Sequence, residues 1–238
     1  MPDRPYTLLS CAVSIDGYLD DASPDRLILS GPEDLDEVDA LRAAADAILV
    51  GAGTVRADNP RLLVRDPARI AAREAAGRPP QPLRVTLTAT GDLDPAASMF
   101  AGPGTALVYC PSPAAAAAGK KLKGRAAVID AGADLSLAAV LQDLHIERSV
   151  ATVLIEGGAR VLRDALAGGL ADELRLAIAP FFVADPSAPR FALPARYPQT
   201  PANPMTLTSL RQVGTVAVHH YRLPVPTAPS VASAAADV

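Results

Sequence analysis

The segment VGAGTVRADNPRLLVR, residues 50–65, places glycines, polar side chains and arginines directly after an apolar run. Glycines at the end of a strand let the backbone approach a phosphate, but they also serve tight turns that bind nothing. A dinucleotide fingerprint would need glycine at position 56 and an acidic residue at the end of a second strand about 20 positions later, and this chain has neither. The segment disfavours a Rossmann site and leaves a cofactor, an anionic substrate or a plain turn open.

Polar side chains in the same segment favour a ligand over a plain turn. Thr54, Asp58 and Asn59 follow the apolar run at the end where open α/β sheets place their ligands. Arg65 comes soon after them, and its guanidinium can hold a phosphate through two parallel hydrogen bonds. The pattern therefore predicts a ligand site where this strand ends.

A second glycine pair stands in VLIEGGARVL, residues 153–162, where an apolar strand ends in Glu156. Gly157 and Gly158 at the start of a helix would let backbone N–H groups approach a pyrophosphate, which the helix dipole favours. Glu156 needs a donor, because an unpartnered carboxylate at the end of a buried strand is costly to desolvate. A ligand that presents N–H groups would meet that need, and the alternative is a carboxylate stabilised by the helix dipole alone.

The remaining polar signals are weaker. Ser14 to Gly17, the sequence SIDG, closes the first predicted strand and by itself indicates only a turn. The 3 histidines show no metal-ligand spacing with Cys, Asp or Glu, so we expect no metal site. Cys11 and Cys110 both lie in apolar runs and are expected to be buried thiols, which favours a reducing, cytoplasmic compartment.

Composition limits the classes of partner. A net charge of -4 and a pI of about 5.4 exclude a global attraction to nucleic acid or to an anionic membrane. The apolar stretch near the N-terminus covers only residues 6–13 and is too short to cross a membrane. We expect one domain over residues 1–224, followed by a disordered tail at 225–238 that lacks hydrophobic periodicity.

Strand-like and helix-like patterns alternate, which predicts an α/β fold with a mixed, mainly parallel central sheet, flanking helices and a C-terminal antiparallel hairpin. Strands are predicted at 6–13, 48–50, 83–88, 106–109, 126–129, 150–155, 174–183, 205–211 and 216–222. Helices are predicted at 33–45, introduced by Ser30 and a proline, at 137–144 and at 159–167. Residues 66–82 and 111–124 are predicted surface excursions, the second a short amphipathic helix with solvated lysines.

Three motifs in this order resemble a known family. They are SIDG at 14–17, LRAAADAILVGAGTVRADNPRLLV at 41–64, and EGGARVL at 156–162 followed by ADELRLAIAP at 171–180. Together they are similar to the pyrimidine reductases of riboflavin biosynthesis, a domain that also forms the C-terminal half of bifunctional deaminase-reductases. The similarity runs from residue 6 to residue 222 and implies a three-layer, dihydrofolate-reductase-like fold.

The resemblance implies a homodimeric, NADPH-dependent enzyme without a deaminase half. Such an enzyme reduces the ring-opened ribose imine of a phosphoribosylamino-pyrimidine to a ribitylamino 5′-phosphate. The positions that match cofactor contacts are Ala12, Gly53, Thr54, Asp58, Gly157, Gly158, Ala159, Arg160, Val161 and Leu162. The positions that match substrate contacts are Arg42, Leu62, Arg65 and Glu156, with the arginines suited to the phosphate and Glu156 to the pyrimidine. Glu156 and Asp16 are the candidate catalytic residues, Asp16 as an organiser of a proton or a water.

Two departures from the family pattern leave the substrate open. Several bacterial deaminase-reductases carry a lysine where this chain has Ser10, and that lysine meets the pyrimidine carbonyl made by deamination. Its absence favours a pyrimidine that still bears its amino group, or a different pyrimidine. The loop DDASPDRLILS, residues 20–30, also lacks the family's usual glycine and aromatic residue, so recognition near Arg26 to Ser30 stays undefined.

Two alternatives stand beside the riboflavin reductase. One is a reductase of the same fold that acts on a dihydropterin such as dihydrofolate, or on another pyrimidine. The other is a catalytically silent NADPH-binding protein. Arg84, with the hydroxyls of Thr86, Thr88 and Thr90, is a candidate site for the 2′-phosphate of NADPH. Residues 172–180 and the terminal hairpin are expected at a dimer interface, because exposed strand edges need cover.

Overall fold

The computed structural model describes residues 3–23 and 27–224, and its elements confirm the predicted α/β alternation. Its strands are β1 Tyr6–Ser14, β2 Ala47–Gly51, β3 Leu83–Leu87, β4 Ala106–Cys110, β5 Ala127–Asp130, β6 Thr152–Gly157, β7 Glu173–Ala179, β8 Thr206–Val213 and β9 Val216–Arg222. Its helices are α1 Pro32–Ala44, α2 Ala52–Asp58, α3 Pro67–Ala75, α4 Ser112–Lys121, α5 Leu137–Ile146 and α6 Ala159–Ala167, with a 3-10 turn η1 at Ser98–Phe100. The predicted tail at 225–238 and Arg26 lie outside the described residues.

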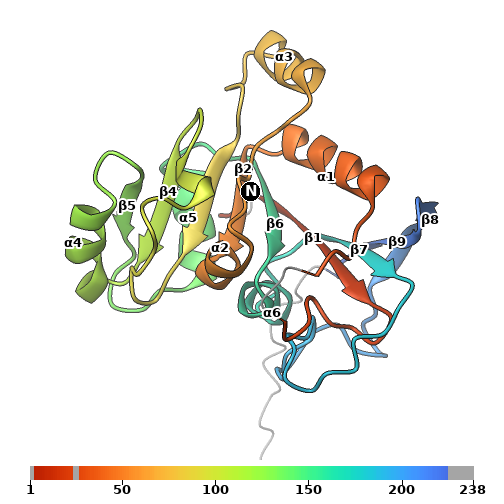
Figure 1. The fold of residues 1–238 in the computed structure, drawn as a ribbon. Helices are drawn as coiled ribbons and strands as arrows, with labels where there is room; N and C mark the ends of the chain where they lie inside the picture. The colour runs from red at the N-terminus through yellow and green to blue at the C-terminus, as the bar shows by residue number, and fades with distance from the viewer. Residues whose placement is uncertain (1–2, 24–26, 225–238) are drawn as a thin grey trace, which may run out of the picture.

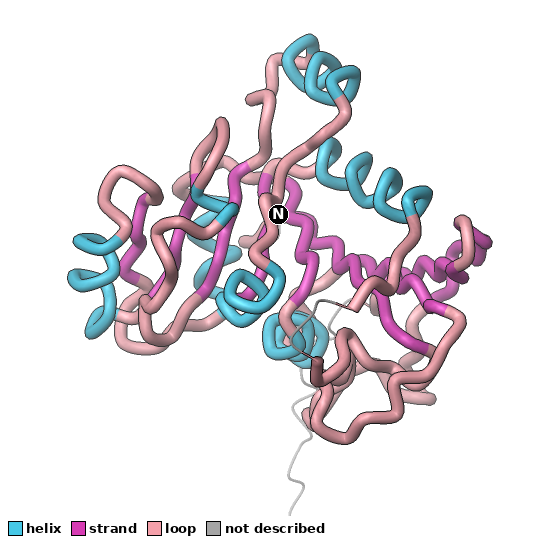
Figure 2. Tube along the Cα trace, viewed as in Figure 1, coloured by secondary structure: helices cyan, strands magenta, loops and turns pink. Residues whose placement is uncertain are grey.

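The strands form one sheet in the order β5-β4-β3-β2-β6-β1-β7-β9-β8. Neighbours from β5 to β7 are parallel, whereas β9 is antiparallel to both β7 and β8. In Figure 1 the sheet runs from β5 and α4 at one side to the β8–β9 hairpin at the other, and Figure 2 shows the helices against it in cyan. The mixed, mainly parallel sheet with a C-terminal hairpin is therefore confirmed.

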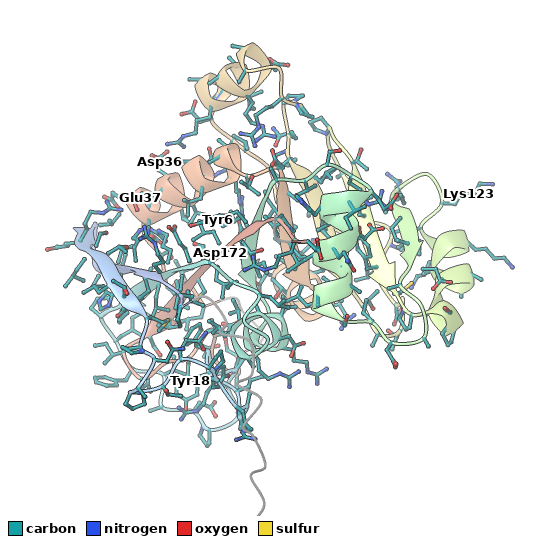
Figure 3. The ribbon with its side chains drawn as sticks, turned by 180° about the vertical axis from the view of Figure 1, so that it is seen from behind. Tyr6, Tyr18, Asp36, Glu37, Lys123 and Asp172 are labelled. Carbon is teal, nitrogen blue, oxygen red and sulfur yellow. The ribbon has the colours of Figure 1, made fainter. Side chains whose placement is uncertain are left out.

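Helices cover both faces of the parallel part of the sheet. One core cluster joins β1, β2, β3, β4 and β6 to the apolar sides of α5 and α6. A second cluster, on the other face, packs Ile48 and Val50 of β2 against Val55 of α2 and the segment that contains Met99. Figure 1 shows α2 in front of the sheet, and the view from behind in Figure 3 brings α5 to the front. Strands buried on both faces explain why β2, AILVG, reads as a continuous apolar run.

Charged contacts fix α1 over the antiparallel end of the sheet. Arg175 of β7 is 1% exposed and donates hydrogen bonds to Asp34 and, at 3.0 Å, to Glu37, both on α1. Arg211 of β8 reaches the same Glu37 carboxylate at 2.8 Å. Figure 3 shows Glu37 on α1 beside the hairpin. A buried arginine needs such partners, since an unpaired buried charge would be strongly destabilising.

Two helices were missed by the sequence patterns. α2 occupies the segment predicted as a glycine-rich strand end, with Gly51 as its N-cap and Asn59 in the left-handed conformation, φ 43°, as its C-cap. α3 lies in the stretch predicted as a surface excursion, where the Asp66 carboxylate accepts a hydrogen bond from the Ala68 N–H and Pro67 takes the first turn. Both begin with capping signals, Gly51 before α2 and the Asp66–Pro67 pair before α3, and α2, with 7 residues, is also shorter than the window that reveals helical periodicity.

Smaller differences concern element ends. β7 ends at Ala179 rather than at 183, because Pro180 has no N–H for the ladder and Phe181 N–H turns back to the Ala179 carbonyl at 2.9 Å. Gly31, not Ser30, caps α1, and no side-chain hydrogen bond supports that cap. The lysines near α4 are exposed as predicted, and Figure 3 shows Lys123 projecting into solvent far from α1.

Candidate active site

A cleft of about 480 Å³ opens between α1, α2, the N-terminus of α6 and the connection after β1. Its volume lies in the range of small-molecule pockets, roughly 300–1,000 Å³. The lining residues are Cys11, Ala12, Leu19, Asp20, Leu27, Ile28, Leu29, Ser30, Leu35, Gly53, Thr54, Ala57, Asp58, Glu156, Gly157, Gly158, Ala159 and Pro189. Its position at the carboxyl ends of parallel strands is where α/β sheets place their ligands.

One side of the cleft is lined by Gly53, Thr54, Gly157 and Gly158, and we call these residues, together with Gly51 in contact with Gly158, the glycine wall. Gly158 is the N-cap of α6 with φ 90°, and a Cβ there would lie 3.3 Å from both the Gly51 nitrogen and the Thr54 hydroxyl oxygen. Only glycine allows this approach of the two chain segments. No side chain caps α6, so its first N–H groups remain available to an anion, as a pyrophosphate requires.

A network of charged side chains, which we call the charged wall, consists of Asp39, Arg42, Arg65 and Glu156, and of these four it is Glu156 that lines the cleft. Arg42 forms a two-bond ion pair with Glu156, Nε to Oε1 at 2.6 Å and Nη2 to Oε2 at 2.6 Å, and its Nη1 donates to the Leu63 carbonyl at 3.2 Å. The two side chains are 17% and 11% exposed. Burial lowers the pKa of Arg42, but the Glu156 carboxylate outweighs that and raises it, so the pair stays ionised on the arginine side.

This ion pair revises the expected roles of both residues. Glu156 lines the cleft as expected, but Arg42 supplies the donor that the sequence assigned to a ligand. Arg42 itself does not line the cleft, because its guanidinium is committed to Glu156 and to the main chain. A carboxylate can accept about four hydrogen bonds, so Glu156 keeps capacity for N–H groups of a ligand.

Arg65 and Leu62 lie outside the cleft lining. Arg65 is 59% exposed and lies at the rim, where its Nη2 donates to the carbonyl of Leu35, a lining residue, at 2.8 Å. Leu62 has φ 53° and a side chain that is 1% exposed within the core beside α2. Leu62 is therefore buried in the core and away from the cleft, whereas the Arg65 guanidinium is accessible.

Asp16 stabilises a turn rather than lining the cleft. Its carboxylate accepts hydrogen bonds from the Ser14 hydroxyl at 2.6 Å, the Val183 N–H at 3.2 Å and the Ala184 N–H at 2.8 Å. Desolvation raises the pKa of Asp16, but these donors outweigh it and hold the pKa below its usual value. A carboxylate so held is a poor proton donor, so the geometry speaks against the catalytic role that the resemblance implied.

The residues matched to the cofactor divide into two groups. The structure brings Ala12, Gly53, Thr54, Asp58, Gly157, Gly158 and Ala159 together along the cleft. Val161 and Leu162 instead turn their side chains into the core beneath α6, and Arg160 is exposed on its first turn. The helix periodicity explains the division, since successive residues of α6 face different directions.

The candidate site for a 2′-phosphate is wrong as a whole. Arg84 is 1% exposed and donates to the carbonyls of Ala101 at 2.5 Å and Gly104 at 2.9 Å. Thr86 and Thr88 are also buried, and in that set only Thr90 reaches the surface. The central position of β3 buries this strand on both faces, which the sequence pattern did not reveal.

Several lining residues were missed from the sequence. Asp20 follows the SIDG motif, and its Oδ1 accepts hydrogen bonds from the N–H groups of Asp21 at 3.0 Å and Leu27 at 3.0 Å. Its position three residues after the SIDG motif was a signal in the sequence that could have identified Asp20 as a lining residue. Pro189 had none, because the connection after β7 reaches the cleft through tertiary contacts, among them the hydrogen bond from the Leu19 N–H to the Pro189 carbonyl at 2.8 Å. Ser10, which replaces the family lysine, is 4% exposed and does not line the cleft.

Within residues 3–23 and 27–224, no group of His, Cys, Asp and Glu is arranged to hold a metal ion. In the same ranges, no helix has the length and apolar character needed to cross a membrane. Among the described residues, the charged ones that line the cleft are acidic, namely Asp20, Asp58 and Glu156.

Solved structures share this architecture. A pyrimidine reductase-like protein from Corynebacterium diphtheriae matches with a TM-score of 0.78 and 25% identity, over 92% of this chain and 92% of that chain. RibD from Acinetobacter baumannii matches with a TM-score of 0.76 and 25% identity over 93% of this chain, which spans 58% of that chain.

Sequence relatives agree with the structural match. A 2,5-diamino-6-ribosylamino-4(3H)-pyrimidinone 5′-phosphate reductase of Archaeoglobus fulgidus is 34% identical over 187 residues, 78% of this chain and 85% of that protein. The protein of the same name from Methanothermobacter thermautotrophicus is 36% identical over 186 residues, 76% of this chain and 80% of that protein. The model of the RibD C-terminal domain matches residues 5–218. The chain therefore belongs to the RibD C-terminal domain family.

Proposed function

We propose that this protein is an oxidoreductase that reduces a ribosylamino-pyrimidine 5′-phosphate to its ribitylamino form in riboflavin biosynthesis, with NADPH as the reductant. The observation that carries the proposal is the meeting of two unlike walls in one cleft. Glu156 offers acceptors for pyrimidine N–H groups beside the uncapped N-terminus of α6, which suits the pyrophosphate of a dinucleotide. The names of the archaeal relatives point to the same reaction.

The substrate that fits the cleft best is the pyrimidine that still bears its exocyclic amino group. The charged lining residues that the structure describes, Asp20, Asp58 and Glu156, are all acceptors, and within residues 3–23 and 27–224 no lysine or arginine lines the cleft to meet an additional carbonyl. The position of the family lysine is occupied by the buried Ser10. This favours the 2,5-diamino substrate that names the archaeal relatives over its deaminated counterpart, and it favours either over dihydrofolate.

The chain's own residues would do the positioning. Gly157, Gly158 and Ala159 would bind the pyrophosphate, while Thr54 and Asp58 on α2 border the nicotinamide end. Glu156, fixed by Arg42, would orient the pyrimidine. The aliphatic side chains Leu19, Leu27, Ile28, Leu29 and Leu35 would exclude water from the reacting atoms. NADPH, when bound, supplies the hydride for the imine carbon.

We also propose a cytoplasmic homodimer. Leu207 and Leu210 of β8 are 50% and 59% exposed and pair across the hairpin with Tyr221 and His219. A second copy that covered this edge would bury the apolar side chains and protect the strand from other pairing. Free, buried Cys11 and Cys110 agree with a reducing compartment.

The test follows the absorbance of NADPH in the presence of aminated and deaminated phosphoribosyl pyrimidines, and of dihydrofolate. We expect NADPH to be oxidised fastest with the aminated phosphoribosyl pyrimidine. Glu156→Gln should lower kcat/KM by about a hundredfold, since one charged acceptor is worth roughly 1.5–3 kcal/mol, while NADPH affinity stays near that of the unmodified chain. Glu147→Gln, at an exposed position after α5, is the control and should change neither. If the protein binds NADPH tightly but oxidises it with none of these substrates, the enzyme proposal fails and the chain is an NADPH-binding protein.

A further inference from the structure

A single carboxylate on α1 ties the exposed Arg65 to the body of the protein. Asp39 is 2% exposed, and its Oδ1 accepts from the Arg65 backbone N–H at 2.7 Å and from the Arg65 Nε at 3.4 Å. Its Oδ2 accepts from the Asp66 N–H at 3.2 Å and from Arg69 Nη1 at 3.0 Å. Burial raises the pKa of Asp39, but these donors outweigh it and lower the pKa, so the carboxylate is charged at neutral pH.

These contacts hold one edge of the Arg65 guanidinium and leave another edge open. Nε faces Asp39, and Nη2 donates to the Leu35 carbonyl at 2.8 Å. Nη1 has no hydrogen bond to any residue that the structure describes. Because Leu35 lines the cleft, the open edge lies at its rim. An arginine in this state is a ready donor for an anion.

The same helix also holds Glu156. Arg42 and Asp39 stand three positions apart on α1, so they share one face of the helix. Arg42 forms hydrogen bonds with the Glu156 carboxylate, which would bind the pyrimidine, and Asp39 forms hydrogen bonds with Arg65 at the rim. One rigid element therefore sets the distance between the two recognition points, as preorganised sites require.

Resting on the proposed function, we propose that Asp39 is a positioning residue that holds Arg65 in place for the 5′-phosphate of the substrate. Arg65 makes the contact with the phosphate, and Asp39 acts only through Arg65. An arginine that is already ordered loses less conformational freedom when the phosphate binds, which raises affinity without a new contact. The substrate phosphate would then be held at the rim by Arg65, apart from the N-terminus of α6 that would hold the pyrophosphate of NADPH.

The test measures binding of ribose 5-phosphate by calorimetry, together with steady-state kinetics on the substrate with and without its phosphate. Asp39→Asn should weaken ribose 5-phosphate binding by about tenfold and raise KM for the phosphorylated substrate by about as much. We expect kcat to stay within about twofold, and KM for the dephosphorylated substrate to stay unchanged. Such a split is the signature of lost phosphate binding rather than of a damaged fold.

Two variants of Arg65 distinguish the effect of the position of its guanidinium from the effect of its positive charge. Arg65→Gln should lose as much ribose 5-phosphate affinity as Asp39→Asn or more, and the double variant should lose no more than Arg65→Gln alone. Arg65→Lys keeps the charge but cannot keep both the Asp39 and the Leu35 contacts, so it should lose nearly as much as the glutamine. These arginine variants test the idea even where Asp39→Asn does not fold, since the Arg65 side chain is exposed.

The control is Asp36→Asn, on the same helix. The Asp36 side chain is 65% exposed and forms hydrogen bonds with Arg69, whereas it acts on Arg65 only through space, and Figure 3 shows it on α1. It should leave ribose 5-phosphate affinity unchanged. The proposal is overturned if Arg65→Lys binds ribose 5-phosphate as tightly as the unmodified chain, or if Arg65→Gln or folded Asp39→Asn shows unchanged affinity for it. It is also overturned if Asp39→Asn raises KM equally for the phosphorylated and the dephosphorylated substrate. If no pyrimidine is reduced but ribose 5-phosphate binding follows this pattern, the proposed function fails and the positioning role stands.

Discussion

The glycine wall lines the cleft, which the charged wall reaches through Glu156, and the two walls are built in different ways. The glycine wall brings backbone atoms together, with a potential Cβ of Gly158 only 3.3 Å from the Gly51 nitrogen. The charged wall depends on pairs of side chains, and its central pair, Arg42 and Glu156, joins residues 114 positions apart. A substitution should therefore disrupt the glycine wall by adding side-chain volume. It should disrupt the charged wall by removing one partner of an ion pair.

The largest effect is expected on the charged wall. Arg42→Ala leaves the mostly buried Glu156 carboxylate without its partner, and it should lower the free energy of unfolding by about 3 kcal/mol. Urea denaturation measures this directly. Arg42→Met combined with Glu156→Gln removes both charges and should recover most of the loss. A loss within about 0.5 kcal/mol, the range of ordinary surface changes, would show that the ion pair does not support the fold.

An intermediate effect is expected on the glycine wall. Gly158→Ala places a Cβ against the Gly51 backbone at φ 90°, so it should weaken NADPH binding by about tenfold, or about 1.4 kcal/mol. Fluorescence titration with NADPH measures the change, and ribose 5-phosphate binding should not follow it. Gly119→Ala in α4, where a Cβ meets nothing within 4 Å, is the matched control. Equal NADPH affinity in both variants would contradict the glycine wall as the pyrophosphate site.

The smallest effect on activity is expected at Asp16, which belongs to neither wall. Asp16→Asn should keep kcat within about twofold at neutral pH, because Asp16 does not line the cleft. Its folded pKa lies below the ordinary value of 3.8, so its stabilising contribution is present above that pH. Below pH 3.8 the contribution is lost as the pH falls through the folded pKa, and the unmodified chain and the variant should converge in urea stability.

A different result would change the assignment of Asp16. If Asp16→Asn reduced turnover by about a hundredfold with substrate and cofactor affinities retained, Asp16 would be a catalytic residue after all. That outcome would place the reacting atoms beyond the cleft described here, near the turn that Asp16 shares with Val183 and Ala184.

Much of the fold could be predicted because its signals are local. The bounds of α6, Ala159–Ala167, and of β9, Val216–Arg222, agree with their patterns to the residue, because glycines bracket the helix and a short turn precedes the strand. α2 and α3 were missed, although Gly51 and the Asp66–Pro67 pair mark their starts. Short helices are stabilised by tertiary packing, here of α2 against β2 and β3 and of α3 against α1, more than by their own periodicity.

The candidate site likewise combines features that the local sequence determines with features that depend on the tertiary structure. Residues 153–162 by themselves determined a glycine pair after an apolar strand, and with it a helix start open to an anion, because glycine conformation and helix polarity are local properties. Only the tertiary structure decided that Glu156 is paired with Arg42, that Arg84 is buried, and that Arg65 lies at the rim. A charged side chain takes its role from its partners and its burial, and both depend on contacts between distant parts of the chain.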